Sequence, residues 1–175
     1  LDEPVSSTAL RFVCIADTHG RLGDIVERIP GGDVLIHAGD MTNFGEKEEL
    51  NKFNDTIDGE DESRRDLPYR GHGTARGYKL LTNCTYLQDC GVKGERWGCS
   101  ELLNTIEKRV RPKFHVFGHV HEQNGLTSNG ETTFINASIC DHQLAPVNNP
   151  IIFDIELRAG TSKNSLSFPL AIVQA

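Results

Sequence analysis

Three short apolar runs, each ending in aspartate or histidine, constrain the fold of this chain most strongly. They are RFVCIADTH, which ends at His19, DVLIHAGD, which ends at Asp40, and FHVFGHVH, which ends at His121. Runs this short and rich in β-branched and aromatic residues are typical of buried strands. Because sites in open α/β sheets gather beyond the carboxyl ends of the strands, we expect the three ends to meet.

The order of the elements in the first third of the chain indicates an α/β fold. We expect strands over 10–16 and 34–38, a short helix over 22–29 between them, and a second helix over 46–57. The helices are predicted from apolar residues at helical spacing. Buried strands that alternate with helices favour parallel pairing. A chain of 175 residues is long enough to bury one core, so a single domain is sufficient.

The second half of the chain is predicted to contain a further helix and more strands. Short strand candidates occur at 78–81 and 85–88, and a helix over 100–110 starts with a serine N-cap and ends before a proline. Its apolar face consists of four residues at helical spacing: Leu102, Leu103, Ile106 and Val110. The last expected strands lie at 113–117, 132–137 and 151–157.

Composition along the chain suggests where the domain begins and ends. Residues 1–9 are polar and are predicted to be a mobile lead-in to a domain that spans 10–157. Residues 58–77 have almost no apolar content, and a stretch of this kind is unusual inside a compact domain, so we interpret it as a polar loop or a deletion junction. The tail, 158–175, has no position in the expected fold.

Charge and apolar run lengths exclude several classes of protein. The net charge of −7 and the lack of a basic block argue against a nucleic-acid partner. The apolar runs are too short for a membrane helix and no leader segment is visible, so a soluble, cytoplasmic protein is expected. The five cysteines form no C-x-x-C pair, and the apolar surroundings of Cys14 and Cys140 predict reduced core thiols.

The strand ends carry a set of side chains suited to binding a metal. Asp17 and His19 are two residues apart, as are His119 and His121, so each pair can point to one side of an extended segment. Asp40 ends the second strand in the same way. A mixed set of two carboxylates and three imidazoles favours Zn, Mn or Fe over Ca. We therefore predict a metal site formed by these five residues.

The other polar residues near the strands have simpler interpretations. His37 and His115 alternate with apolar neighbours and are expected to be hydrogen-bonded core or near-site residues rather than ligands. His72 lies in the polar stretch and is expected to be a solvated loop residue, while His142 has no partner in view. Asn136 ends a strand and is expected to form a turn or to hydrogen-bond to a site residue.

The ordered motifs D-x-H, G-D and G-H-x-H resemble those of calcineurin-like metallophosphoesterases. The surrounding sequences NKFND, LLTNCTYLQD, ELLNTIEKRVRPKFHVFGHVHE and FINAS are similar to the metallophosphoesterase-domain-containing subfamily. The resemblance covers 10–57 and 78–157. It implies a two-sheet α/β sandwich with a dinuclear metal centre between the sheets, which hydrolyses phosphomonoesters or phosphodiesters. Cyclic nucleotides are the substrate class suggested for this subfamily.

Two parts of the family pattern are missing from this chain. The G-N-H-[ED] motif, with its Asn ligand and catalytic His, and a further His before G-H-x-H cannot be found. A splice variant, a gene-model error or a real deletion would each explain an incomplete sandwich. The resemblance implies that Asp17, His19, Asp40 and His121 complete one metal site, whereas Asp40 and His119 alone remain for the second. No catalytic residue can be assigned.

The resulting hypothesis is a metal-dependent phosphoesterase that uses metal-activated water and has impaired activity because one metal site is incomplete. The alternative is a catalytically inactive, metal-binding relative that acts as a binding or scaffold protein. A truncated product that folds poorly is a third reading. The expected partner is a small phosphoester or nucleotide, with no nucleic acid and no membrane, and the substrate, physiological metal and oligomeric state stay open.

Overall fold

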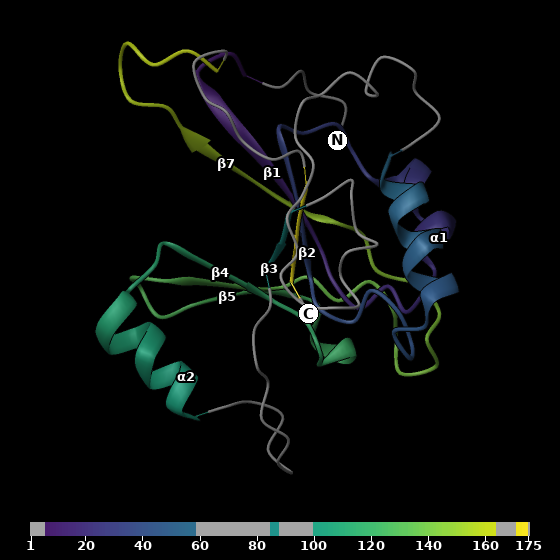
Figure 1. Ribbon diagram of the computed structural model, residues 1–175. Helices are drawn as coiled ribbons and strands as arrows, with labels where there is room; N and C mark the ends of the chain where they lie inside the picture. Colours follow the sequence, from purple (N-terminus) through teal and green to yellow (C-terminus); the bar gives the residue numbers. More distant parts are fainter. Residues whose placement is uncertain (1–5, 59–84, 88–99, 164–170, 175) are drawn as a thin grey trace.

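The computed structural model describes residues 6–58, 85–87, 100–163 and 171–174, and within them two β-sheets pack against each other (Figure 1). One α-helix, α1 (Lys47–Asp58), lies against the larger sheet. A second, α2 (Ser100–Thr105), lies beside the smaller sheet. This arrangement agrees with the predicted two-sheet α/β class.

The larger sheet has five strands in the order β3-β8-β2-β1-β7. Its strands are β1 (Ala9–Ile15), β2 (Val34–Ala38), β3 (Thr85–Leu87), β7 (Ile151–Glu156) and β8 (Ala171–Gln174). β1 and β2 pair in parallel, as predicted, and β8 pairs in parallel with β2 and β3. β7 is antiparallel to β1 and forms one edge. The carboxyl ends of β1 and β2 therefore lie next to each other, which brings two of the predicted site motifs together.

The smaller sheet has three strands in the order β4-β6-β5. Its strands are β4 (Phe114–Phe117), β5 (Gly125–Ser128) and β6 (Thr133–Asn136). β4 and β6 are parallel, whereas β5 is antiparallel to β6. The third site motif follows β4 directly, so this sheet carries it.

The two sheets share one apolar layer. The ring of Phe153 on β7 stacks on Phe114 of β4, with centroids 4.1 Å apart, and on Phe12 of β1, with centroids 5.0 Å apart. Ala16 and Ser138, just past the ends of β1 and β6, form a parallel β-bridge. The sheets are therefore joined at the ends of the strands that carry the site motifs.

Side chains that alternate along β1 face two different apolar layers, one between the sheets and one under α1. Cys14 belongs to the layer between the sheets, and the next residue, Ile15, faces the layer under α1. Two successive side chains of a strand point to opposite faces, so one strand supports both layers. Cys14 and Cys140 are buried and free, as predicted. The layer under α1 is formed by Ile15, Leu22, Ile25, Met41, Leu50, Phe53 and Ile139.

The segment predicted as a short helix over 22–29 is instead a pair of 3₁₀ turns, η1 (Leu22–Asp24) and η2 (Val26–Arg28). Leu22 and Ile25 are still buried, so this part of the apolar pattern faces inward. The segment contains a glycine and ends at Pro-Gly-Gly, which disfavour a regular α-helix of this length. The prediction of an α-helix here is wrong, and of its predicted apolar face Leu22 and Ile25 are buried whereas Val26 is 45 % exposed.

The predicted helix over 100–110 forms as α2 followed by a π-helical turn, η5 (Ile106–Val110). It ends directly before Pro112, as predicted, at Arg111, which has a left-handed conformation. Ile106 alone of its apolar face is buried, whereas Leu102, Leu103 and Val110 are 43 %, 47 % and 59 % exposed. The expected core contact of this face is therefore not made by the described residues.

Two strands were not predicted. β5 is short, largely exposed and contains no alternating pattern, so nothing in the sequence predicts a strand there. β8 lies in the unplaced tail, where a parallel partner distant in sequence creates the strand. β1 begins at Ala9, inside the expected lead-in. The strand candidate at 78–81 and residues 59–77 of the polar stretch, with His72, fall outside the described residues.

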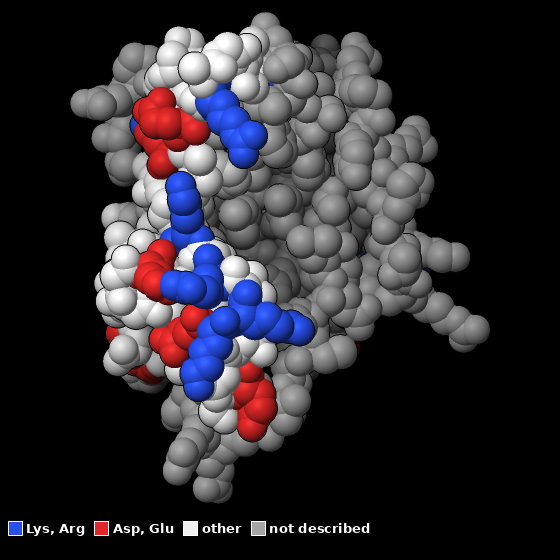
Figure 2. Space-filling view, turned by 90° about the vertical axis from the view of Figure 1, so that its left-hand side faces the viewer, with Lys and Arg blue, Asp and Glu red and all other residues white. Residues whose placement is uncertain are grey.

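The described surface mixes both charge signs. On the face that carries α2, Lys and Arg side chains lie among Asp and Glu side chains (Figure 2). Arg111 forms an ion pair with Glu131, and Arg11 with Asp154 at 2.9 Å. Among the described helices, none combines the length and apolar character needed to cross a bilayer.

Candidate metal centre

The loops that follow β1 and β2 are held together by backbone hydrogen bonds beyond the ends of the strands. The amide of Asp17 donates to the carbonyl of Gly39 at 3.1 Å, and the amide of His19 donates to the carbonyl of Asp40 at 3.0 Å. A third bond of 2.9 Å joins Gly20 to Met41. The D-x-H and G-D motifs are thus parts of one hydrogen-bonded unit, as parallel strands with adjacent carboxyl ends require.

Backbone strain is concentrated at the predicted ligands. Six non-glycine residues of the described chain have positive φ, and four of them are Asp17, His19, Asp40 and His119, with φ of 51°, 45°, 44° and 80°. A left-handed conformation costs a non-glycine residue about 1 kcal/mol or more and is found mainly where the surroundings enforce it. Such clustering is typical of a functional site.

Gly118 allows the third motif to approach the first. A Cβ atom at this position would overlap the carboxylate of Asp17 and would lie 2.7 Å from the Cβ of Ala16. Without a side chain, the backbone passes close enough for the amide of His119 to donate to Asp17 Oδ2 at 2.6 Å. The glycine of G-H-x-H is therefore required by packing between the sheets.

Asp17 is the most enclosed member of the site, with 1 % of its surface exposed. Its Oδ2 accepts hydrogen bonds from the hydroxyl of Ser138 and from the amide of His119. Burial raises the pKa of Asp17 above its usual value, and the negative charge of Asp40 adds to this, while the two hydrogen bonds and His121 act in the opposite direction. A buried carboxylate of this kind gains from a nearby positive charge.

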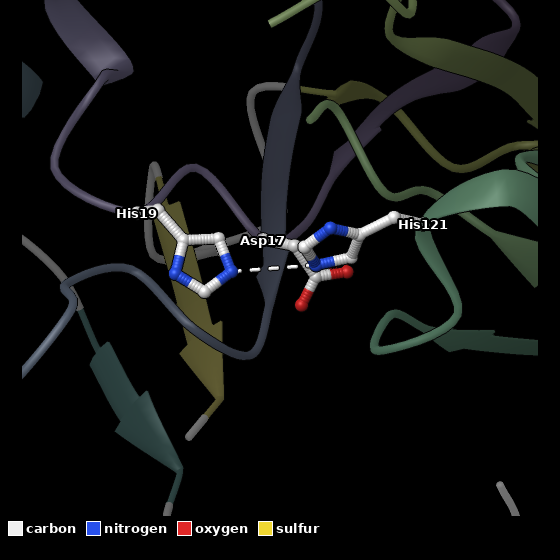
Figure 3. Close-up of side chains that lie close together, drawn as sticks. All are labelled: Asp17, His19 and His121. Carbon is white, nitrogen blue, oxygen red and sulfur yellow. Dashed lines mark hydrogen bonds between the residues drawn. The ribbon is translucent and has the colours of Figure 1, made fainter. Parts of the chain in front are cut away.

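The imidazoles of His19 and His121 point toward each other beside this carboxylate (Figure 3). Their Nε2 atoms lie 3.3 Å apart. His121 Nδ1 lies 2.8 Å from the carbonyl of Asp141. Because a carbonyl accepts and never donates, Nδ1 of His121 carries the proton and Nε2 carries the lone pair. The Asp141 carbonyl thus fixes the tautomer that a metal ligand needs.

This donor set fits a divalent ion. One ligand atom each from Asp17, His19 and His121 lies within 4.8 Å of the other two. Two nitrogens bound to one ion at about 2.0–2.1 Å would be roughly 3.0–3.4 Å apart, which matches the separation of the Nε2 atoms. Two imidazoles and a carboxylate suit Zn, Mn or Fe. Three of the five predicted ligands are therefore brought together.

Asp40 and His119 lie beside this group without joining it. Both residues are exposed, and the group of three does not include them. Asp40 is near enough to raise the pKa of Asp17, and His119 contributes its backbone amide to the Asp17 carboxylate. Their assignment as ligands stays a prediction.

Sequence reasoning missed Ser138 and Asp141, both of which act on a ligand of the group. The Ser138 hydroxyl donates to Asp17, and the carboxamide oxygen of Asn136 lies 2.7 Å from that hydroxyl and accepts from the Ser138 amide at 3.2 Å. The Asn136 amide group donates to the carbonyl of Val120 at 2.7 Å. Asn136 therefore hydrogen-bonds to residues near the site, as predicted. Ser138 follows it by two residues, and this spacing was the sequence feature from which Ser138 could have been identified.

The remaining histidines of the described chain are outside the group of three. His37 is buried and hydrogen-bonded to Thr18, in agreement with the predicted core or near-site role. His115 is half-buried and stacks on Phe117, with ring centroids 5.5 Å apart. His142 is exposed, with its Nδ1 3.9 Å from a carboxylate oxygen of Glu122.

The fold and the donor set agree with the resemblance seen in the sequence, and comparison with known proteins identifies the family. The chain is 38 % identical over 244 residues to the UPF0046 protein C25E10.12 of Caenorhabditis elegans, covering 93 % of this chain and 87 % of that protein. It is 32 % identical over 241 residues to the human metallophosphoesterase domain-containing protein 1, covering 88 % and 73 %. No family model matches. The chain belongs to the metallophosphoesterase-domain-containing family.

The lengths of these alignments reveal a difference from the relatives. Both aligned stretches are longer than the 175 residues of this chain. The relatives therefore contain internal residues with no counterpart here, which agrees with the expectation of missing internal segments.

Proposed function

We propose that this protein is a metal-dependent phosphoesterase of reduced activity that acts on a small phosphodiester, with cyclic nucleotides as the substrate class. The observation that carries the proposal is the convergence of Asp17, His19 and His121 from both sheets, within 4.8 Å of one another. Membership of a family named for metallophosphoesterase domains supports the reaction class.

Each of four residues would contribute one ligand to the ion. Asp17 supplies negative charge in a buried setting, His19 and His121 supply nitrogen, and Asp40 is the fourth ligand that the family resemblance implies. A bound divalent ion would polarise the phosphate and lower the pKa of a water molecule so that it can attack phosphorus. Asp141 and Ser138 keep the imidazole and the carboxylate oriented for this task.

Reduced activity is proposed because few candidate ligands are available for a second ion. Asp40 and His119 are the remaining candidates, and both are exposed and outside the group of three. Hydrolysis with two ions clamps the attacking and leaving oxygens, whereas one ion gives part of that stabilisation. We therefore infer one tightly bound ion, with Mn, Zn and Fe as the candidates.

The test combines metal analysis with turnover. The purified protein should bind one Mn²⁺ tightly and hydrolyse bis-p-nitrophenyl phosphate and 3′,5′- or 2′,3′-cyclic nucleotides slowly, in a metal-dependent way. D17N should lose both properties, with D24N, a substitution of an exposed aspartate outside the group, as the matched control. Two tightly bound ions per chain, or turnover that D17N leaves unchanged, would contradict the proposal.

The alternative is a metal-binding relative that serves as a binding or scaffold protein. Asp40 and His119 are not part of the group of three, which favours this alternative, because three ligands can hold an ion without completing a catalytic centre. One bound ion with no turnover of any of the phosphodiesters above would select this reading.

A further inference from the structure

His37 is a buried histidine that the proposed metal site does not use. It lies in the middle of β2, is 0 % exposed, and burial lowers its pKa to about 3, so the ring is neutral. Its Nδ1 atom makes no hydrogen bond with the described chain. A buried polar atom without a partner costs about 1–3 kcal/mol. A phenyl ring would avoid this cost, so packing alone does not account for a histidine here.

The hydrogen bond from the His37 side chain to Thr18 connects it to the site. Its Nε2 lies 2.8 Å from the hydroxyl of Thr18, which is also 0 % exposed. The imidazole packs edge-on against Phe53 of α1, with ring centroids 5.2 Å apart. The Thr18 side chain is therefore fixed on the α1 side of the larger sheet.

Thr18 is the residue between the two ligands of the D-x-H motif. Asp17 and His19 on either side of it both have positive φ, a conformation that needs support from the surroundings. The carboxylate of Asp17 contacts Ser138 and the backbone of His119, on the side of the smaller sheet. Anchoring the middle residue toward α1 thus keeps its two neighbours directed the other way.

We propose that His37 is a positioning residue, which acts through the Thr18 hydroxyl to hold Asp17 and His19 in the conformation that presents both to one ion. The inference rests on the proposed metal site. The Thr18 hydroxyl is 3.5 Å from the carbonyl of Met41, which is too long to replace the bond to His37.

The test separates metal affinity from stability. Mn²⁺ binding is measured by titration calorimetry, and unfolding by urea is measured without metal, for wild type, T18S, T18V, H37F and the double variant T18V/H37F. We expect T18S to bind Mn²⁺ within about threefold of wild type, and the other three variants to bind it about 10- to 100-fold more weakly, the range seen when support to a ligand is removed.

The double variant is the decisive one. Removing both polar partners leaves no orphaned hydroxyl, so the metal-free protein should be as stable as wild type while its Mn²⁺ affinity is reduced to the level of the single variants. Wild-type affinity in T18V and the double variant, with or without lower stability, would overturn the proposal and leave the metal site intact. A wild-type protein that binds no Mn²⁺ would overturn both.

Discussion

The two halves of the candidate centre differ in how they are held. The Asp17 side is buried and braced by Ser138 and the His119 amide, and it faces two imidazoles. The Asp40 side chain is exposed; its backbone is hydrogen-bonded to His19, and the carboxylate of Glu49 accepts from the amides of Asn43 and Phe44, which follow it. The interior of the sandwich thus fixes the Asp17 side chain, whereas the Asp40 side chain lies at the surface, beside a cap at the start of α1.

The buried half is the one that brings possible metal ligands together. The pKa of Asp17 is raised by burial even though it accepts two hydrogen bonds, so a nearby cation would stabilise the carboxylate, which supports the proposed role of Asp17 as a ligand. An exposed carboxylate such as Asp40 needs no such explanation. The asymmetry agrees with a chain that aligns with longer relatives and lacks internal residues that they contain.

The largest effect is expected from closing the space between the sheets. In G118A the added Cβ would overlap the Asp17 carboxylate and press on Ala16, so we expect about 1–3 kcal/mol lower stability and no tight Mn²⁺ binding. Urea unfolding and calorimetric titration measure the two effects. G23A, at a glycine with open space around its Cβ, is the control. Normal Mn²⁺ affinity in G118A would show that the braced half is not where the ion binds.

A matched pair of histidines tests the comparison directly. H121A removes a ring nitrogen from the group of three, whereas H119A leaves the backbone bond to Asp17 in place. We expect Mn²⁺ affinity to fall at least about 100-fold in H121A and less than about tenfold in H119A, since removing a ligand costs more than removing its support. Equal losses in the two variants would mean that the halves are equivalent.

A smaller effect is expected from the brace on Asp17. S138A removes the hydroxyl that donates to the carboxylate and should weaken Mn²⁺ binding about tenfold, at the low end of the range for such support. Because this hydrogen bond lowers the pKa of Asp17, its loss should raise that pKa further. S128A, on the exposed strand β5, serves as control. If S138A bound Mn²⁺ as tightly as wild type, the hydrogen bond from the His119 amide would be sufficient to hold the Asp17 carboxylate in place.

The smallest effect concerns the surface cap of the Asp40 side. Glu49 accepts hydrogen bonds from the amides of Asn43, Phe44 and Glu46, which hold its pKa below the usual value. A carboxylate with a lowered pKa stabilises the fold above its ordinary pKa, and this contribution is lost as the pH falls through the lowered value. E49Q should therefore melt a few degrees below wild type at pH 7, with the difference vanishing in acid.

Melting curves between pH 7 and pH 3 measure this dependence, with E48Q on the same helix as control. If the difference in melting temperature between E49Q and wild type were the same at pH 3 as at pH 7, the charge of Glu49 would not be the source of its stabilising effect.

Much of the fold was predictable because apolar periodicity reports which face of an element is buried. The strand 34–38 was predicted at its observed bounds, and α1 within a residue. The 3₁₀ turns were not predicted, because the glycine in that segment disfavours an α-helix. β8 was not predicted, because it forms by pairing with a parallel strand distant in sequence. The apolar face of α2 was predicted as buried, yet burial depends on what a face meets, which spacing does not reveal.

The family and the candidate ligand types could be read from the sequence, because D-x-H, G-D and G-H-x-H are local patterns at the ends of apolar runs. Which ligands meet was decided only by the tertiary structure, through distances between segments about a hundred residues apart. Asp17, His19 and His121 converge because β4, which precedes His121, pairs with β6, and the end of β6 is bridged to the end of β1, while Asp40 and His119 remain exposed. The bracing by Ser138, Asp141 and His37 likewise depends on contacts between sheets and loops that no local pattern encodes.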